Sequence, residues 1–453
     1  MMASVLASST TRMILGLGET GTSVARWFIA QGIEFLATDT RPEVLTSATV
    51  LEVVEDERRI VAADDVPAAL ERTNELIVSP GIALDHHWVE TARKAGARII
   101  GDIDLFVAEA SAPIIGITGS NGKSTVAALV AHMIEACGKK VGLGGNIGMP
   151  ALTVLDPATD FYVLELSSFQ LERSEPLNLD VATVLNITAD HLDRHGSMPK
   201  YHLAKHQIFR GAKAVVVNRS DPLTQPLVDT PVGVVIWRPE EPDLREWGVR
   251  VSDGKRFICR GFDPVVEVDQ LIIKGAHNVN NALVALAICT ALKLPIEAAV
   301  GGLLSFCGLP HRCELVAEAA GVKWINDSKG TNVGACIAAL EGLGRSQNVI
   351  LIVGGQGKHQ DFAPLADPVQ AHCRRVITMG EAARDLEIVL GQLVPVNRVQ
   401  TIEAAVARAG ETAEEGDIVL LSPACASFDM YDNYQARGDA FRVAVTERSG
   451  VAA

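Results

Sequence analysis

Short runs of apolar residues alternate with amphipathic stretches along most of the chain. The runs are typical of buried strands, and the stretches between them have the periodicity of helices. Strands that alternate with helices predict parallel sheets covered by helices. The predicted strands lie at residues 13–18, 33–39, 76–78, 98–100, 114–118, 161–165, 181–186, 215–218, 349–353, 375–379 and 417–421. In the clearest helical stretch, one apolar face is formed by Val126, Leu129, Val130, Met133 and Ile134.

The chain has 453 residues, which is too long for one compact core. We therefore predict three α/β domains: a Rossmann-like domain over 1–107, a phosphate-loop domain over 108–308 and a second Rossmann-like domain over 309–453. The strands predicted at 349–353, 375–379 and 417–421 each end in a turn rich in glycine or serine, which is where α/β sheets place their ligands.

Composition excludes several classes of protein. The formal charge of -15 argues against a general nucleic-acid binder, because phosphate contacts require clustered lysine and arginine. No apolar run is long enough to predict a membrane span, and the first residues lack the pattern of an export signal. The eight cysteines form no C-x-x-C pair and fit reduced thiols in a cytoplasm.

Residues 116–125, GITGSNGKST, have the composition of a phosphate-binding loop. Gly119 stands two residues later than the first glycine of the common G-x-x-x-x-G-K-[ST] motif. A predicted strand precedes the loop and a predicted helix follows it, and this context favours a nucleotide over a chance glycine turn with a surface lysine. Loop N–H groups and the helix dipole would hold phosphates, Lys123 would reach the outer phosphates, and Ser124 or Thr125 would offer a hydroxyl to Mg²⁺.

The loop's spelling, TGSNGKST from residue 118 to 125, resembles that of the Mur ligase and folylpolyglutamate synthetase superfamily. In that superfamily, T-G-x-x-G-K-[ST] replaces the common motif. Other segments resemble it at residues 144–148, 164–171, 186–196, 201–209, 275–282 and 310–312. The resemblance implies that ATP is bound by Gly119, Ser120, Asn121, Gly122, Lys123, Ser124, Thr125, Asn278, Asn281, Arg312 and Asp327.

The same resemblance implies a Mg²⁺ site and the catalytic residues. The metal ligands would be Ser124, Thr125, Glu165, His191 and, if carbamylated, Lys205, and the catalytic residues would be Lys123, Glu165, His191 and Lys205. Each assignment has a simpler alternative. Glu165 follows a predicted strand and would also fit a capping or solvent-facing glutamate. A lone loop histidine such as His191 is more often structural, and a helical lysine such as Lys205 is ordinarily exposed.

Residues 326–332, NDSKGTN, and the turn 354–358, GGQGK, resemble the Mur ligases that add D-glutamate, as does the segment 421–438. Tyr434 stands where phenylalanine is common in that group. Cationic and hydroxyl side chains suit the two carboxylates of D-glutamate, although each lysine alone would equally fit a structural ion pair. Cys425 lies in this segment as a small packed residue. The implied D-glutamate site comprises Lys329, Thr331, Lys358, Ser427, Phe428 and Tyr434.

The first domain carries G-x-G-x-x-G at residues 16–21 and Asp39 at the end of the next predicted strand. This pattern is a dinucleotide fingerprint and suggests NAD. The resemblance implies instead that the turn binds the UDP part of a muropeptide substrate. The implied residues are Gly18, Thr20, Asp39, Thr40, Arg41, Ser79, Gly81 and Asn146.

The resemblance as a whole implies a cytoplasmic, monomeric, ATP- and Mg²⁺-dependent amide ligase of peptidoglycan synthesis. It would join D-glutamate to UDP-N-acetylmuramoyl-L-alanine through an acyl phosphate, with no nucleic-acid or membrane partner. Two alternatives remain open on the sequence, namely an NAD-dependent oxidoreductase and a nucleotide-binding regulatory protein. No dehydrogenase acid–base set accompanies the fingerprint, and neither alternative explains the third domain.

Overall fold

The computed structural model describes residues 11–227, 233–358 and 360–449. Most of the segment considered for an export signal lies outside these residues. The chain forms two compact units. The first covers the chain up to Ile187 with His191–Trp237 and Val284–Gly302, and the second covers Thr188–Asp190, Arg238–Leu283 and the chain from Leu303 onward.

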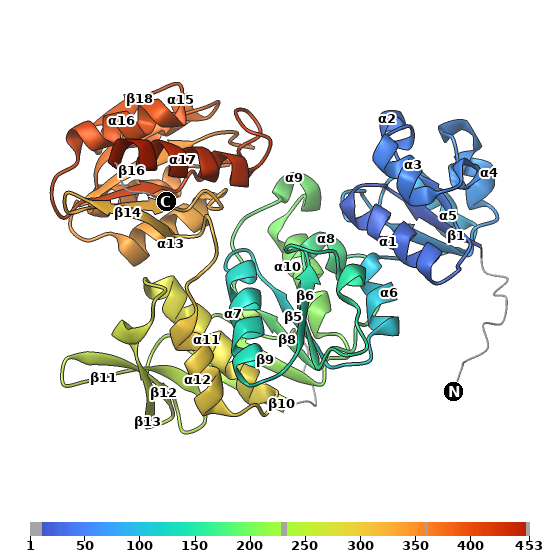
Figure 1. Cartoon of the computed structure of the whole chain (residues 1–453), viewed down its shortest axis with the longest axis horizontal. Coiled ribbons are helices and arrows are strands. Elements are labelled where there is room, and N and C mark those ends of the chain that lie inside the picture. The colour runs from blue at the N-terminus through green and yellow to red at the C-terminus, as the bar shows by residue number, and fades with distance from the viewer. Residues whose placement is uncertain (1–10, 228–232, 359, 450–453) are drawn as a thin grey trace. The chain divides into compact units, whose positions relative to one another are not determined.

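The first sheet is parallel, with strand order β2-β1-β3-β4, and lies in the first unit (Figure 1). Alternate residues of β1 face opposite helix layers: Ile14 packs in a core with Phe28 of α1, and Met13 packs in another with Trp88 of α5. The strands are β1 (Arg12–Leu15), β2 (Leu36–Thr38), β3 (Glu75–Val78) and β4 (Arg98–Ile100). The helices are α1 (Glu19–Ala30), α2 (Pro42–Leu45), α3 (Ala48–Val54), α4 (Val66–Leu70), α5 (His87–Lys94) and α6 (Asp102–Glu109).

Six further parallel strands of the first unit follow the order β10-β9-β8-β5-β7-β6. The central strand β5 is buried along its whole length, as expected of a parallel strand covered on both faces. The predicted apolar face of the next helix, α7, is buried as well. The strands are β5 (Ile114–Thr118), β6 (Val141–Gly145), β7 (Phe161–Glu165), β8 (Val181–Val184), β9 (Ala214–Asn218) and β10 (Gly233–Trp237). The helices are α7 (Lys123–Ala136), α8 (Ser168–Leu171), α9 (Leu192–His195) and α10 (Met198–His206), followed later in the chain by α11 (Ala276–Ala291) and α12 (Ile296–Ser305).

The second unit contains a six-stranded sheet of order β14-β15-β19-β16-β17-β18, in which only the β14–β15 pair is antiparallel. One core lies between this sheet and α13, α14 and α15, and another lies on the opposite face against α16 and α17. The strands are β14 (Glu314–Ala319), β15 (Val322–Asn326), β16 (Val349–Gly354), β17 (Cys373–Met379), β18 (Val396–Arg398) and β19 (Ile418–Leu421). The helices are α13 (Val333–Leu343), α14 (Ala366–His372), α15 (Ala383–Leu390), α16 (Ile402–Thr412) and α17 (Tyr434–Ser449).

The predicted parallel strands are confirmed, although β2 is shorter than the predicted run at 33–39. The antiparallel strands were not predicted. They comprise the β14–β15 hairpin and the meander β11 (Trp247–Ser252), β12 (Lys255–Arg260) and β13 (Asp263–Glu267). The meander was missed because many of its positions are polar and exposed, so it presents no continuous apolar run.

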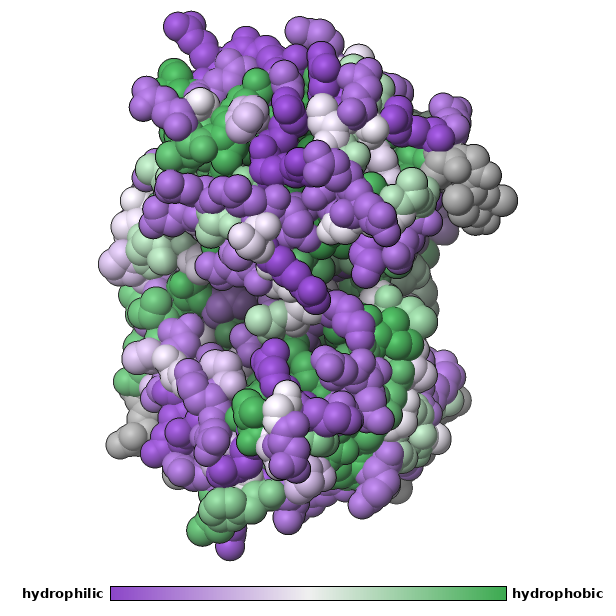
Figure 2. Space-filling model, turned by 90° about the vertical axis from the view of Figure 1, so that its left-hand side faces the viewer, coloured by the Kyte–Doolittle hydropathy of each residue, from purple (hydrophilic) through white to green (hydrophobic). Residues whose placement is uncertain are grey.

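On the face drawn in Figure 2, polar residues cover most of the surface and apolar residues lie between them in smaller groups, as is usual for globular proteins. Within the described ranges, none of the helices combines the length and apolarity needed to cross a bilayer.

Candidate functional site

The phosphate-loop candidates lie at the carboxyl edge of three adjacent strands, β8, β5 and β7. The loop is anchored to the residue two positions beyond β8: Ser120 N donates to Asn186 O at 2.9 Å, and Asn121 N donates to Asn186 Oδ1 at 2.9 Å. A Cβ at Gly119 would lie 3.0 Å from the Cβ of Leu185, so the shifted glycine is required by the close approach of the β8 segment. The departure of this loop from the common phosphate-binding motif therefore has a packing reason.

The helix after the loop presents an N-terminus suited to anions. Gly122 has a left-handed backbone with φ of 81° and immediately precedes α7, whose first turn contains no acidic residue. The helix therefore contributes no carboxylate of its own that would offset its dipole at this end. Lys123 turns back over the loop, and its Nζ donates to Ser120 O at 2.9 Å. The arrangement has the features of a phosphate site.

Glu165 ends β7 and is buried beside this loop. In the ladder, Glu165 pairs with Ile117 of β5. Its Oε2 accepts from Ser124 Oγ at 2.5 Å, and its Oε1 accepts from Asn146 Nδ2 at 2.8 Å. A solvent-facing role is excluded by its exposure of 2%. A carboxylate and a hydroxyl held together are hard oxygen ligands of the kind that Mg²⁺ binds.

Lys205 is buried, so the ordinary expectation of an exposed helical lysine is wrong. Its exposed fraction is 2%, and its Nζ donates to Gly119 O at 2.8 Å. The ammonium also lies 4.5 Å from the ring centroid of Tyr201, one turn earlier in α10. The Tyr201 hydroxyl is 3.0 Å from Ser120 Oγ. Two residues of α10 thus contact the phosphate-loop candidates directly.

His191 immediately precedes α9 and has a left-handed backbone with φ of 53°. Its ring meets Phe169 of α8 edge-on, with centroids 4.9 Å apart. Since α8 begins three residues after Glu165, the segments that carry His191 and Glu165 are linked through this aromatic contact. Among the residues that the structure describes, no three His, Cys, Asp or Glu side chains form a metal-binding group.

Asp39, the acidic residue of the dinucleotide fingerprint, accepts hydrogen bonds from the protein itself. Asp39 Oδ2 accepts from Leu17 N at 2.7 Å and from Arg41 Nη2 at 3.1 Å. Its Oδ1 accepts from Arg41 N at 2.9 Å and from Arg41 Nε at 3.0 Å. Burial works to raise the pKa of Asp39, but the hydrogen bonds from Arg41 and Leu17 outweigh it and hold the pKa below its usual value. A carboxylate has about four acceptor positions, so little capacity remains for the ribose hydroxyls of NAD.

The other candidates of this domain lie at two linked turns. Gly18 precedes α1, and a Cβ at Gly21 would lie 1.8 Å from Gly16 O, so the third fingerprint glycine is required by helix–strand packing. Ser79 Oγ donates to Gly16 O at 2.7 Å and joins the turn after β3 to the turn after β1. Thr40, Gly81 and the end of the Arg41 side chain are exposed, and Thr20 is half-buried. Asn146, by contrast, lies outside this domain and donates a hydrogen bond to Glu165.

Four of the nucleotide candidates belong to the second unit, whereas the phosphate loop belongs to the first. The predicted common face of Asn278 and Asn281 is confirmed, because Asn281 Nδ2 donates to Asn278 Oδ1 at 3.0 Å. Asp327 is fully buried. Burial raises its pKa to about 6, although hydrogen bonds from Ser422 Oγ (2.7 Å) and Cys313 N (3.2 Å) and the charge of Arg312 oppose the rise.

The D-glutamate candidates lie on loops at the carboxyl ends of β15, β16 and β19 and at the start of α17. The two lysines lie over aromatic rings: Lys329 Nζ is 4.1 Å from the ring centroid of Tyr434, and Lys358 Nζ is 5.6 Å from that of Phe428. Phe428 is 64% exposed, and its neighbour Ser427 is buried. Thr331 is half-buried in the loop after β15. Cys425 is packed in the core, as predicted.

Arg437 of α17 supports these loops and was not predicted as a site residue. Its buried guanidinium donates to Ser328 O at 2.8 Å, Ser328 Oγ at 3.0 Å, Cys425 O at 3.1 Å and Ala426 O at 3.3 Å. Burial lowers its pKa to about 10. Arg437 thereby ties the loop containing Lys329 to the loop containing Ser427. An arginine in the signature segment was the only sequence signal.

Comparisons with known proteins match the chain in three consecutive stretches. The family models are the Mur ligase MurD-like N-terminal domain over residues 10–101, the Mur ligase middle domain over 117–289 and the Mur ligase glutamate ligase domain over 311–425. The chain is 47% identical over 449 residues to UDP-N-acetylmuramoylalanine--D-glutamate ligase of Pseudomonas aeruginosa, covering 98% of this chain and 99% of that protein. It is 44% identical over 447 residues to the protein of the same name from Legionella pneumophila, covering 96% and 98%.

Solved structures share the fold at lower identity. UDP-N-acetylmuramate-alanine ligase of Thermotoga maritima matches with a TM-score of 0.61 and 18% identity, covering 97% of this chain and 99% of that one. FolC of E. coli, solved in complex with DHPP and ADP, matches with a TM-score of 0.58 and 19% identity, covering 77% and 94%. At these identities the likeness shows the fold alone.

Proposed function

Because the chain belongs to the Mur ligase family, we propose that it joins D-glutamate to UDP-N-acetylmuramoyl-L-alanine in an ATP-dependent reaction of peptidoglycan precursor synthesis. The specific substrates are supported by the names of relatives that match nearly end to end at 44–47% identity. The single structural observation that carries the proposal is the phosphate loop held against Glu165 and Lys205. The same relatives disfavour an NAD-dependent oxidoreductase.

The chemistry would proceed in two steps. A carboxylate oxygen of the alanyl group attacks the γ-phosphorus of ATP, so that an acyl phosphate forms and ADP leaves. The amine of D-glutamate, in its neutral form, then attacks the acyl carbon, and inorganic phosphate leaves as the amide forms and the nitrogen loses a proton. Positioning and neutralisation of phosphate charge would supply most of the catalysis.

The loop residues 119–125 would hold the ATP phosphates, with Lys123 on the outer ones. Asn278, Asn281, Arg312 and Asp327 would also bind ATP. The joined oxygens of Glu165 and Ser124, with the hydroxyl of Thr125, fit Mg²⁺, which when bound would neutralise phosphate charge and polarise the phosphorus–oxygen bond. Because three protein side chains rarely suffice for Mg²⁺, phosphate oxygens and water would supply the remaining ligands.

His191 and Lys205 would complete the metal and catalytic set, with Lys205 carbamylated. In carbamylation, the ammonium of Lys205 would first lose a proton. The neutral amine would then add to carbon dioxide and lose a second proton, so that a cation is converted into an anion. The burial of Lys205 beside the phosphate loop supports this assignment, because a carbamate there would lie close to the phosphates and to a metal that they bind.

The remaining assignments follow the domains at 1–107, 108–308 and 309–453. Gly18, Thr20, Asp39, Thr40, Arg41, Ser79, Gly81 and Asn146 would bind the UDP substrate. Lys329, Thr331, Lys358, Ser427, Phe428 and Tyr434 would bind D-glutamate, with the lysines facing its carboxylates. We place the enzyme in the cytoplasm as a monomer. Its eight unpaired cysteines support a reducing compartment.

The test is phosphate release by the purified chain with ATP, Mg²⁺ and UDP-N-acetylmuramoyl-L-alanine, with and without D-glutamate. We expect sustained release only when D-glutamate is present, together with the amide product by mass spectrometry. Release that ignores D-glutamate would favour a regulatory ATPase, and hydride transfer to NAD would favour the oxidoreductase.

A further inference from the structure

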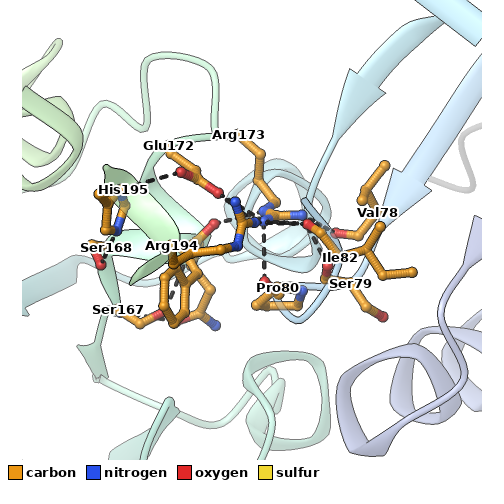
Figure 3. Close-up of polar contacts among 12 residues, drawn as sticks. Val78, Ser79, Pro80, Ile82, Ser167, Ser168, Glu172, Arg173, Arg194 and His195 are labelled. Carbon is orange, nitrogen blue, oxygen red and sulfur yellow. Dashed lines mark hydrogen bonds and ion pairs between the residues drawn. The ribbon is translucent and has the colours of Figure 1, made fainter. Parts of the chain in front are cut away.

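A buried arginine, Arg173, joins the segment after helix α8 to the loop after β3. Arg173 lies two residues after α8, and its side chain has an exposed fraction of 0%. Its guanidinium meets the loop 78–82 of the first sheet (Figure 3). The hydrogen bonds run to the carbonyl oxygens of Val78 (3.2 Å), Ser79 (2.9 Å), Pro80 (3.2 Å) and Ile82 (3.2 Å).

Every nitrogen of this guanidinium is engaged. Nε donates to Phe169 O at 2.6 Å, and Nη2 also donates to Glu172 Oε1 at 3.2 Å. Burial lowers the pKa of Arg173 to about 10, against the opposing charge of Glu172, so the group stays charged at neutral pH. A buried charge is costly unless its geometry is satisfied. The planar fork of arginine supplies five N–H donors for these acceptors, which the three of lysine cannot match.

A second arginine extends the contacts to the segment that carries His191. Arg194 of α9 donates from Nη2 to Ile82 O at 2.9 Å and to Glu172 Oε1 at 3.0 Å (Figure 3). His195, the last residue of α9, contacts Glu172 Oε2 at 3.6 Å and Ser168 Oγ at 2.9 Å. Glu172 therefore links Arg173 to α9 through its contacts with Arg194 and His195. This helix begins immediately after His191.

The loop gripped by Arg173 is also the loop that supports the fingerprint turn. Ser79 N donates to Leu15 O at 2.9 Å, and Ser79 Oγ donates to Gly16 O at 2.7 Å. A continuous path of hydrogen bonds thus runs from α8 through Arg173 and Ser79 to the turn at Gly16–Gly18. This path links the first sheet's nucleotide turn to the segment that follows β7 of the second sheet.

We infer that Arg173 is a positioning residue for the UDP substrate: it fixes the Ser79 loop and the turn it supports, so that a substrate held there extends its carboxyl group correctly to the phosphate-loop site. The inference rests on the proposed function, in which this turn binds UDP. A misplacement of about 1 Å far from the chemistry can cost about a hundredfold in rate. Losing Arg173 should therefore affect the UDP substrate selectively.

The chain offers a matched control at the same junction. Arg98 at the start of β4 forms an ion pair with Glu175, and both side chains are about half exposed. Exposed pairs contribute little to stability. Arg98→Met removes a charge near α8 without touching the Ser79 loop, and we expect it to behave as wild type.

The experiment compares wild type, Arg173→Met, Arg173→Lys and Arg98→Met. Calorimetry measures the binding of UDP-N-acetylmuramoyl-L-alanine alone and of MgATP alone, and steady-state kinetics gives KM for each substrate. We expect Arg173→Met to weaken binding of the UDP substrate by about 10- to 100-fold and Arg173→Lys by a smaller factor. Affinity for MgATP and KM for D-glutamate should stay within about twofold of wild type.

Unchanged binding of the UDP substrate in both Arg173 variants overturns the inference, as does an equal loss for all three substrates, which would mark a general structural role. If Arg173→Met does not fold, Arg173→Lys decides by the same two criteria. Failure of the wild type to bind the UDP substrate at all is a separate result, and it refutes the proposed function and with it the inference.

Discussion

Two buried arginines, Arg173 in the first unit and Arg437 in the second, hold loops beside the two candidate sites in different ways. Both donate to backbone carbonyl oxygens, and burial lowers the pKa of both to about 10. Arg173 also meets the carboxylate of Glu172 and shares Ile82 O with Arg194. Arg437 holds Ser328, Cys425 and Ala426, which lie within one sheet's loops.

The difference separates two functions of a buried charge. Arg173 joins two sheets, so its loss should alter the relative placement of a nucleotide turn and a phosphate loop. Arg437 joins two loops of one sheet, so its loss should weaken that domain. The first unit thus carries the predicted phosphate chemistry and the second carries the predicted amino-acid recognition, and variants in each should fail in separable ways.

The largest effect should come from the phosphate loop. Lys123→Ala removes the cation expected on the outer phosphates and should lower product formation by at least about 10³-fold, in the range found when a cation that stabilises phosphoryl transfer is lost. Circular dichroism and thermal unfolding should match wild type, because the substitution leaves the loop backbone and the buried apolar face of α7 in place. Lys139→Ala, beyond the far end of α7, is the control. Wild-type turnover in Lys123→Ala would remove the ATP assignment.

Lys205→Ala should lower turnover by about 10²- to 10³-fold, with partial recovery on addition of acetate, whose carboxylate can replace that of a carbamate. Turnover assays with increasing acetate measure the recovery. The exposed Lys200, earlier in α10, supplies the control variant Lys200→Ala. Normal turnover in Lys205→Ala would show that no carbamate acts there.

Arg437→Met should destabilise the second unit by about 3–4 kcal/mol, because several buried acceptors lose their donor and each costs about 1–3 kcal/mol. Arg173→Met should cost a similar amount, because Phe169, Val78, Ser79 and Pro80 lose a donor while Arg194 still donates to Ile82 and Glu172. Urea unfolding of both variants measures the two losses. No loss of stability in Arg437→Met would contradict its assignment as the support of the second unit's loops.

A buried aspartate lies near each arginine and should make stability depend on pH. Burial raises the pKa of both Asp102 and Asp327 to about 6 from the ordinary value of 3.8. Between about pH 4 and 6 the unfolded chain releases these protons while the folded chain keeps them, so each group lowers stability as pH rises through that window. Asp102 Oδ1 has no hydrogen-bond partner among the described residues.

Asp102→Asn should therefore gain stability over wild type as pH rises from 4 to 7, by up to about 3 kcal/mol. Asp327→Asn should gain less, because an amide keeps one acceptor oxygen for the two donors Ser422 and Cys313. Urea unfolding at several pH values tests both variants. A gain in Asp102→Asn that is independent of pH would contradict the assignment.

The smallest effect should be at the D-glutamate site. Lys329→Ala should raise KM for D-glutamate by about tenfold through loss of one charge-assisted hydrogen bond, with KM for ATP unchanged. Lys323→Ala, on β15 and exposed, is the matched control. Steady-state kinetics with D-glutamate and ATP varied in turn measures both KM values, and a rise in KM for ATP alone would move Lys329 to the nucleotide site.

The parallel sheets and the phosphate loop were predictable from sequence because their signals are local. The apolar run at Ile114–Thr118 and the glycines after it specify strand, turn and helix within a few residues. The burial of Glu165 and Lys205 required the fold, since their partners are Ser124 and Gly119, distant in the chain. The substrate roles of individual residues stay predictions.

Arg173 and Arg437 were beyond sequence reasoning for a physical reason. Their partners are mostly backbone carbonyls, which every residue carries, so no residue type marks the acceptor. The antiparallel meander β11–β13 was missed because exposed polar positions interrupt its apolar pattern. Long-range acceptors and half-exposed strands are the features that a one-dimensional pattern conveys least.

The saturated carboxylate of Asp39 bears on how cofactor choice changes between related folds. Arg41 supplies three of the four donors around it, from a position only two residues away. Replacing that one side chain would uncover oxygen lone pairs at the place where a dinucleotide's sugar is recognised, while the glycine turn stayed as it is. Selectivity between a uridine nucleotide and a redox coenzyme would then depend on a single neighbouring cation. The glycine pattern by itself would not distinguish the two ligands.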